Sequence, residues 1–181
     1  MTLFNPLFEG RLVRLAAPLP SDRDDFARWS QNDTYLRLLD DDPVRPQAPG
    51  QFETNASAQD FYFHLRTVDQ DQLIGFVVLF NLKWSNQTAE MAIGIGEPSH
   101  WGHGYGSDAL RLILNYAFNE LNLYRVGLTV LEYNTRAIQA YERAGFVREG
   151  VQRQAVCREN RRYDLIAYGI LRDEWLNQQE S

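Results

Sequence analysis

The segment 100–107 contains glycines at 102, 104 and 106 and directly precedes a pattern typical of an amphipathic helix. Glycine lets the backbone adopt a positive φ and lets a ligand approach without obstruction by a Cβ atom. The free N–H groups and the dipole at a helix N-terminus favour an anion such as a phosphate. It is not a P-loop, because no Gly-Lys-Ser/Thr follows. The segment alone fits either a phosphate-binding loop or an ordinary strand-to-helix turn.

Asn134 and Tyr141 form a second candidate pair, two turns apart on one side of a predicted helix. The apolar stripe of that helix includes Ala137 and Ile138, and Gly145 is suited to its C-terminal cap. Asparagine is a good N-cap, and a tyrosine on an apolar stripe is usually a core residue. Each residue taken alone therefore has an ordinary structural explanation.

Hydrophobic periodicity predicts the elements that must position these residues. Strands are predicted over Arg11–Ala16, Phe61–Thr67, Leu73–Trp84, Ala89–Ile95, Tyr124–Leu131, Phe146–Cys157 and Tyr163–Leu171. Helices are predicted over Asp22–Gln31, from Gly106 to about Leu121, and from Asn134 to Ala144. The proline-rich Asp40–Asn55, which begins with three aspartates, is predicted to be a long surface loop. This order of elements indicates a mixed sheet with helices on its faces, in an α/β or α+β domain.

The length of 181 residues predicts one domain spanning 1–181. With 18 Lys+Arg against 24 Asp+Glu, the net charge is −6, the opposite of what binding to nucleic-acid phosphates requires. No signal-peptide pattern or long apolar run is visible. A single cysteine, Cys157, excludes an internal disulfide and a multi-cysteine metal site, and we expect it to be an ordinary strand residue. We therefore expect a cytoplasmic protein with no metal, nucleic-acid or membrane partner.

Taken together, the two motifs indicate a protein family more specifically than either motif does alone. Gly102-His-Gly-Tyr-Gly106 before a helix, followed after a strand by Asn134-x-x-Ala-Ile-x-x-Tyr141-x-x-x-Gly145-Phe146, resembles the GNAT superfamily of acetyl-CoA-dependent N-acetyltransferases. The resemblance runs from about Gly10 to Trp175. The segments 146–150 and 163–164 are similar to the branch that acetylates ribosomal-protein N-termini or polyamines. The resemblance implies a single GNAT-like domain with a mixed, mostly antiparallel sheet of about seven strands and helices on both faces.

The resemblance also implies roles for individual residues. The family pattern Gln/Arg-x-x-Gly-x-Gly/Ala falls on 101–106, so that Trp101 stands where a polar side chain is usual. Backbone amides of the loop would hold the pyrophosphate of CoA: His103, Gly104, Tyr105, Gly106 and Ser107. The strand ending at Ile95 would separate from its neighbour and pair with the pantetheine arm, and Asn134 would also bind that arm. Tyr141 would protonate the departing thiolate, and Glu90 would be the base, with Glu132 or a water chain as alternatives.

The implied reaction is direct attack of a primary amine on the thioester of acetyl-CoA. An α-amino group, with a pKa of about 7.8, is neutral far more often at pH 7 than a lysine-like amine with a pKa of about 10.4. This favours a peptide or protein N-terminus as acceptor, followed by a polyamine or another small amine. The acidic run 40–42 would attract a cationic acceptor, and a homodimer is common in this branch. The alternative is a catalytically idle GNAT-like module that binds acyl-CoA as a sensor or scaffold.

Overall fold

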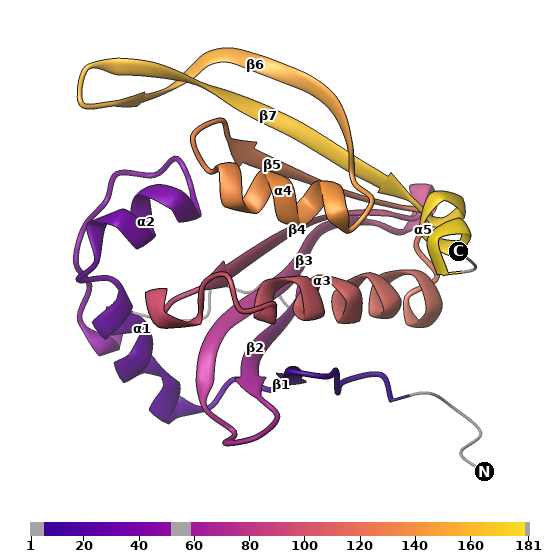
Figure 1. The fold of residues 1–181 in the computed structure, drawn as a ribbon, viewed down its shortest axis with the longest axis horizontal. Helices are drawn as coiled ribbons and strands as arrows, with labels where there is room; N and C mark the ends of the chain where they lie inside the picture. The colour runs from indigo at the N-terminus through magenta and orange to yellow at the C-terminus, as the bar shows by residue number, and fades with distance from the viewer. Residues whose placement is uncertain (1–5, 52–58, 180–181) are drawn as a thin grey trace.

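A seven-stranded sheet forms the centre of the computed structural model, which describes residues 6–51 and 59–179 (Figure 1). The strands are β1 (Val13–Ala16), β2 (Phe61–Thr67), β3 (Leu73–Lys83), β4 (Thr88–Ile95), β5 (Arg125–Leu131), β6 (Val147–Arg158) and β7 (Arg161–Leu171). Their order in the sheet is β1-β2-β3-β4-β5-β7-β6, and every neighbouring pair is antiparallel except β4 and β5. The predicted mixed, mostly antiparallel sheet is confirmed.

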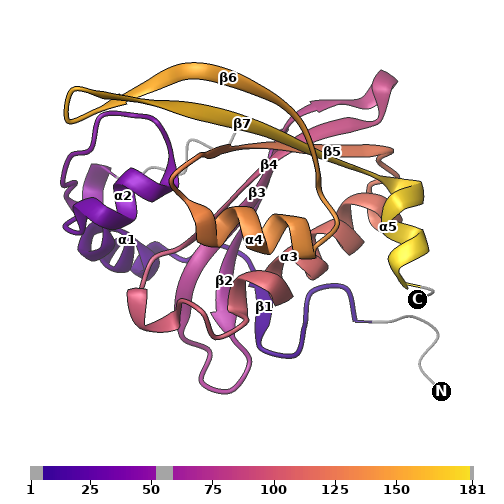
Figure 2. The ribbon, with the colours of Figure 1, turned by 45° about the horizontal axis from the view of Figure 1, so that its top comes forward.

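Helices cover both faces of this sheet, as expected. They are α1 (Arg23–Trp29), α2 (Asp33–Leu39), α3 (Tyr105–Asn115), α4 (Thr135–Arg143) and α5 (Arg172–Gln179). α3 and α4 pack on one face, where Ile113 and Tyr141 belong to the main apolar core (Figures 1 and 2). α1 lies against the other face, where the ring of Phe26 contacts those of His64 and Phe76.

The first helical region differs from its prediction. The single helix expected over 22–31 is the shorter α1, and a second helix, α2, follows it without having been predicted. Asn32 caps α2, since its Oδ1 accepts the N–H of Tyr35. Both helices have seven residues, fewer than the 11–18 over which helical periodicity is read, so their number and bounds do not follow from the apolar pattern. The loop predicted over Asp40–Asn55 is confirmed up to Gln51, apart from a short 3₁₀ turn at 49–51, and its remainder lies outside the described residues.

The sheet divides between β4 and β5. These parallel strands pair only over Thr88–Glu90 and Arg125–Gly127. Beyond that point β4 stays paired with β3 as far as Ile95, whereas β5 stays paired with β7 as far as Leu131. The strand that precedes the glycine segment therefore separates from its neighbour, as the resemblance implied.

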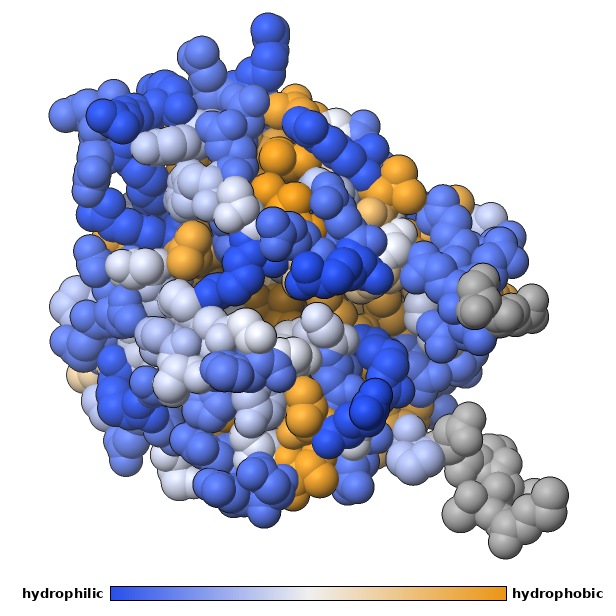
Figure 3. Space-filling view, viewed as in Figure 1, coloured by the Kyte–Doolittle hydropathy of each residue, from blue (hydrophilic) through white to orange (hydrophobic). Residues whose placement is uncertain are grey.

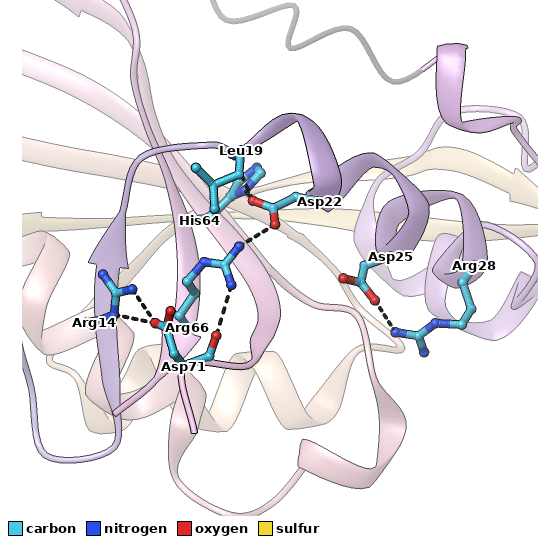
Figure 4. Close-up of polar contacts among 8 residues, drawn as sticks. All are labelled: Arg14, Leu19, Asp22, Asp25, Arg28, His64, Arg66 and Asp71. Atoms are coloured by element: carbon cyan, nitrogen blue, oxygen red, sulfur yellow. Dashed lines mark hydrogen bonds and ion pairs between the residues drawn. The ribbon is translucent and has the colours of Figure 1, made fainter. Parts of the chain in front are cut away.

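A buried polar cluster fixes the start of α1 to β2 (Figure 4). Asp22 accepts hydrogen bonds from the backbone N–H of Leu19 and from the guanidinium of Arg66, and its Oδ2 lies 2.5 Å from Nδ1 of His64. Arg66 already neutralises Asp22, so a proton on His64 would leave an uncompensated charge in the interior. Burial accordingly lowers the pKa of His64 and outweighs the opposing effect of Asp22.

This cluster predicts that the protein loses stability as the pH falls from 7 towards 5. In that range His64 takes up a proton in the unfolded chain, where its pKa is about 6.5, before it does so in the folded protein. The loss is at most about 1.4 kcal/mol per pH unit. His64→Asn keeps an N–H donor near the position of Nδ1 but does not titrate, so its melting temperature should fall less over this range.

The matched control is His103→Asn, because His103 is exposed. Melting temperatures of the two variants and the unmodified protein, measured from pH 8 to pH 5, provide the comparison. Parallel curves for all three proteins would show that His64 does not control this loss.

Candidate active site

A cavity of about 410 Å³ lies where β4 and β5 separate. Its walls come from the open ends of both strands, the glycine loop (residues 101–107), one face of α4 and the C-terminal end of α2. The space-filling view shows a hollow between α3 and α4 with apolar residues at its base (Figure 3). The two motifs that were recognised separately in the sequence therefore line one space.

The cavity exposes two unpaired strand edges. The facing segments 91–95 of β4 and 128–131 of β5 both line it, and they form no sheet pairs with one another. Free backbone N–H and C=O groups on a strand edge can bind an extended chain as an additional strand. At the end of β4, the carbonyl of Ile95 already accepts the indole N–H of Trp101 at 2.8 Å. The space between the two strand edges is thus suited to a narrow ligand that contains amide groups.

The glycine loop has the backbone conformation that its sequence indicated. Gly102 and Gly104 have φ values of +79° and +89°, and Gly104 is the N-cap of α3. The next three N–H groups, of residues 105–107, open the helix and lack intrahelical acceptors. Asp108 does not occupy this position, because its Oδ2 accepts the N–H groups of Leu12 and Val13. The start of α3 is therefore open to an anion.

The predicted loop residues differ in where their side chains lie. Gly104, Gly106 and Ser107 line the cavity, and a Cβ atom built on Gly106 would meet no atom within 4 Å. His103 is exposed and is not part of the cavity wall. Tyr105 packs against the main core and its ring contacts that of His100. For His103 and Tyr105 only a backbone contact with a ligand fits these positions.

Tyr141 lies in the wall of the cavity and is buried. Burial raises the pKa of its phenol to about 12, so that the hydroxyl is protonated at neutral pH and available as a hydrogen-bond donor. Its ring packs at a steep angle against Phe146, with ring centroids 5.8 Å apart. Tyr141 is therefore a core residue that also lines the cavity.

Asn134 is confirmed as the N-cap of α4, since its Oδ1 accepts the N–H of Ala137 at 3.2 Å. Its Nδ2 donates to the carbonyl of Leu38 at 3.0 Å, which joins α4 to the end of α2. Asn134 also lines the cavity. One N–H and one lone pair of its amide remain for a ligand.

The two predicted base candidates have different environments. Glu90 lies at the last residue pair before β4 and β5 separate, and it lines the cavity. Its nearest hydrogen-bond partner is Asn81, whose Nδ2 is 3.4 Å from Oε2. Glu132 is not in the cavity wall, and its Oε1 accepts the backbone N–H of Asp164 at 2.9 Å. Of the two carboxylates, only Glu90 faces the cavity.

The end of α2 supplies a wall of which the sequence had indicated only the acidic run 40–42. Tyr35, Leu38 and Leu39 line the cavity together with Asp40 and Asp41. Burial raises the pKa of Asp40, and its acidic neighbours act in the same direction. No sequence signal placed α2 here, because its position depends on contacts with residues about 100 positions later in the chain.

The tip of the β6–β7 hairpin holds this acidic segment in place (Figure 2). The guanidinium of Arg158 donates to the carbonyls of Asp40 and Asp42 at 2.9 and 3.0 Å. Arg37 pairs with Glu159 at 2.6 Å. Arg158 thus satisfies backbone carbonyls of the segment that follows α2.

Within residues 6–51 and 59–179, no group of three or more His, Cys, Asp or Glu side chains is arranged to hold a metal ion. In the same part of the chain, no helix has the length and apolar character needed to cross a bilayer. Cys157 is exposed in β6 and is not part of the cavity wall.

Comparison with known proteins identifies the class. Residues 13–147 match the family model described as "Acetyltransferase (GNAT) domain". The chain therefore belongs to the GNAT acetyltransferase family, as the resemblance had implied. GNAT acetyltransferases use acetyl-CoA as their co-substrate.

Two curated relatives have names that mention different acceptors. The chain is 34% identical over 111 residues to the spermidine N(1)-acetyltransferase of Vibrio cholerae, covering 61% of this chain and 64% of that protein. It is 34% identical over 103 residues to the "Putative ribosomal N-acetyltransferase YdaF" of Bacillus subtilis, covering 57% and 56%. These alignments span less than two thirds of either relative.

The structural comparison covers more of the chain. The crystal structure of spermidine N-acetyltransferase from Vibrio cholerae in complex with CoA and spermine superposes with a TM-score of 0.78 at 25% identity. The superposition covers 91% of this chain and 98% of that one. The fold described above is thus that of a GNAT acetyltransferase.

Proposed function

We propose that this protein is a single-domain enzyme, spanning residues 1–181, that transfers the acetyl group of acetyl-CoA to a primary amine. The observation that carries the proposal is the cavity at the β4–β5 split, which is lined by the glycine loop, Tyr141 and Glu90. Family membership supports the same reaction.

The cavity has the features that acetyl-CoA requires. The pyrophosphate of acetyl-CoA fits against the free N–H groups of residues 105–107 at the start of α3. Gly102 and Gly106 leave open space there, because a Cβ on either would meet no atom within 4 Å. The amides of the pantetheine arm fit the unpaired edge of β4 over 91–95. This arrangement directs the thioester towards Tyr141 and Glu90.

The chemistry needs one donor and one proton acceptor. A neutral amine attacks the thioester carbonyl, the tetrahedral oxyanion collapses, and CoA departs as a thiolate. Complete proton transfer from Tyr141, with its pKa of about 12, to a thiolate whose acid has a pKa of about 8.5 is uphill by about 5 kcal/mol. Tyr141 therefore acts first as a hydrogen-bond donor to the developing thiolate. Glu90 accepts the proton of the attacking amine, directly or through water.

Carboxylates at the α2 end of the cavity and at the β4–β5 split favour a cationic acceptor. Asp40 and Asp41 line it at the α2 end and Glu90 lines it at the split. A polyamine, which carries several positive charges, gains more from these carboxylates than a peptide N-terminus with one. We therefore propose a polyamine-like amine as the preferred acceptor. A peptide N-terminus, which has a larger neutral fraction at pH 7, is the second candidate.

The test is a calorimetric titration with acetyl-CoA, followed by a thiol-release assay with spermidine, α-amino peptides and aminoglycosides. Binding with turnover on spermidine would support the proposal in full. Turnover on peptides alone would replace the acceptor, whereas binding without turnover on any amine would favour the idle acyl-CoA sensor. Absence of binding would contradict the function altogether.

Replacing Asp40, Asp41 and Asp42 together by Asn should raise the KM for a cationic acceptor about tenfold. The KM for acetyl-CoA should stay unchanged, because the glycine loop and the β4 edge are untouched. Asn retains the hydrogen-bonding shape of Asp, including the acceptor that Asp40 offers to the N–H of Asp42. Steady-state kinetics with each substrate varied in turn measure both constants.

The matched control replaces three other exposed aspartates by Asn, namely Asp24, Asp69 and Asp173. These residues lie outside the cavity wall, so this variant has the same net charge with an intact acidic wall. Equal acceptor KM values for the two triple variants would exclude a local role for the acidic run 40–42.

A further inference from the structure

Arg136 is a cation in the cavity wall that no carboxylate neutralises. It is the second residue of α4, and within residues 6–51 and 59–179 it forms no ion pair. Several other arginines of the chain are paired, for example Arg66 with Asp22 and Arg125 with Glu149. A cation in the first turn of a helix is opposed by the helix dipole. An anion near Arg136 would offset this opposition.

Trp101 holds this guanidinium in place. The Cζ atom of Arg136 lies 3.7 Å from the centroid of the Trp101 ring, which is a close cation–π contact. The indole is itself fixed, because its Nε1 donates to the carbonyl of Ile95 at 2.8 Å. The pair thus connects α4 to the first residue of the glycine loop.

The same cavity wall contains the free N–H groups at the start of α3. Gly102 directly follows Trp101, and a Cβ atom on Gly102 or Gly106 would meet no atom within 4 Å. Both glycines and Arg136 line the same cavity, so the loop backbone and the guanidinium border one space. Phosphate oxygens accept hydrogen bonds from backbone N–H groups and from a guanidinium at once.

We propose that Arg136 binds the pyrophosphate of acetyl-CoA and that Trp101 is the positioning residue that holds Arg136 towards it. This inference rests on the proposed function, because it concerns the co-substrate of the same site. It also accounts for Trp101 at a position where the family pattern has Gln or Arg. In this chain the side-chain cation comes from α4, and the loop supplies the aromatic face that holds it.

The first test measures the Kd of acetyl-CoA by calorimetry. Arg136→Ala should raise it about tenfold, as expected for the loss of one charge-assisted contact in a partly exposed site. Arg136→Lys should recover part of the affinity, since it retains the charge but not the planar fork. Arg153→Ala is the control: Arg153 is exposed on β6 outside the cavity wall, and its removal lowers the net charge equally.

The second test uses S-acetylpantetheine, which has the thioester and the pantetheine arm but no phosphate. The ratio of its Kd to that of acetyl-CoA, obtained by NMR titration to millimolar concentrations, should fall about tenfold in Arg136→Ala. A variant that weakens both ligands equally would show that Arg136 only supports the fold of the cavity.

A double-mutant cycle tests the role of Trp101. Trp101→Leu should weaken acetyl-CoA binding in the unmodified protein but have little further effect in Arg136→Ala, because the two residues act as one unit. Additive losses would overturn the positioning role. The outcomes for the inference and for the proposed function are distinguishable. If the unmodified protein binds acetyl-CoA and acetylates an amine, an unchanged Kd for acetyl-CoA in Arg136→Ala would overturn this inference and leave the proposed function intact. If the unmodified protein binds no acetyl-CoA, both fail. Binding without turnover would contradict the enzyme alone.

Discussion

Replacing Tyr141 by Phe is expected to lower kcat about 100-fold, the lower end of the range for general-acid catalysis, because the hydrogen bond to the developing thiolate is lost. The affinity for acetyl-CoA should hardly change, because Phe keeps the ring that packs against Phe146. Only the hydroxyl is lost, and burial keeps this hydroxyl protonated at neutral pH. The measurement is kcat from thiol release, combined with the Kd of acetyl-CoA from calorimetry.

Tyr105→Phe is the matched control for this variant. Tyr105 lies in the glycine loop, but its side chain packs against the core and is not part of the cavity wall. Its kcat should stay within about twofold of the unmodified enzyme, because no hydroxyl near the thioester is removed. An unaffected kcat in Tyr141→Phe would mean that the thiolate departs without help from the phenol.

Gly104→Val is expected to weaken acetyl-CoA binding by at least about tenfold. Gly104 has a φ of +89°, a region that costs a residue with a Cβ atom roughly 1–2 kcal/mol, and β-branched residues tolerate it least. A Cβ atom there would also lie 3.3 Å from Leu12. The loop must then change its conformation, and the N–H groups that open α3 lose their alignment. Calorimetry gives the Kd, and thermal unfolding reports the accompanying loss of stability.

Gly106→Ala distinguishes loss of the loop conformation from a general intolerance of side chains. Gly106 lies within α3 and a Cβ atom there meets open space, so alanine should stabilise the helix by up to about 1 kcal/mol. Acetyl-CoA affinity should be retained, since the family pattern accepts alanine at this position. Normal binding in Gly104→Val would instead indicate that the loop is only a turn.

Much of the fold could be predicted because its strands are long and regular. The meander of β2, β3 and β4 follows directly from three apolar runs separated by short polar turns, and the helix that follows Gly104 has a broad apolar stripe. Asn134 was recognisable as an N-cap because capping depends on local residue type. These features depend on short-range chemistry, which the sequence states directly.

The missed parts of the site depend on contacts between distant segments. α2 is held at its C-terminal end by Tyr133 and Asn134, which donate to the carbonyls of Arg37 and Leu38. No pattern within 33–39 could reveal these partners. Arg136 likewise looks like any exposed helical arginine until Trp101 is found beneath it. The two motifs could be predicted from the sequence, whereas the contribution of α2 to the cavity wall and the Arg136–Trp101 pair could not.

The separation of β4 from β5 also bears on aggregation. A strand edge with free N–H and C=O groups is ordinarily a template on which other chains assemble, and natural proteins protect such edges. Here two such edges lie inside the molecule, where α4 and the glycine loop restrict access to them. A cavity of about 410 Å³ suits a thin, flexible chain better than the strand of another protein, which has side chains on both faces. The fold thereby keeps unpaired strand edges for a ligand while limiting their pairing with strands of other protein molecules.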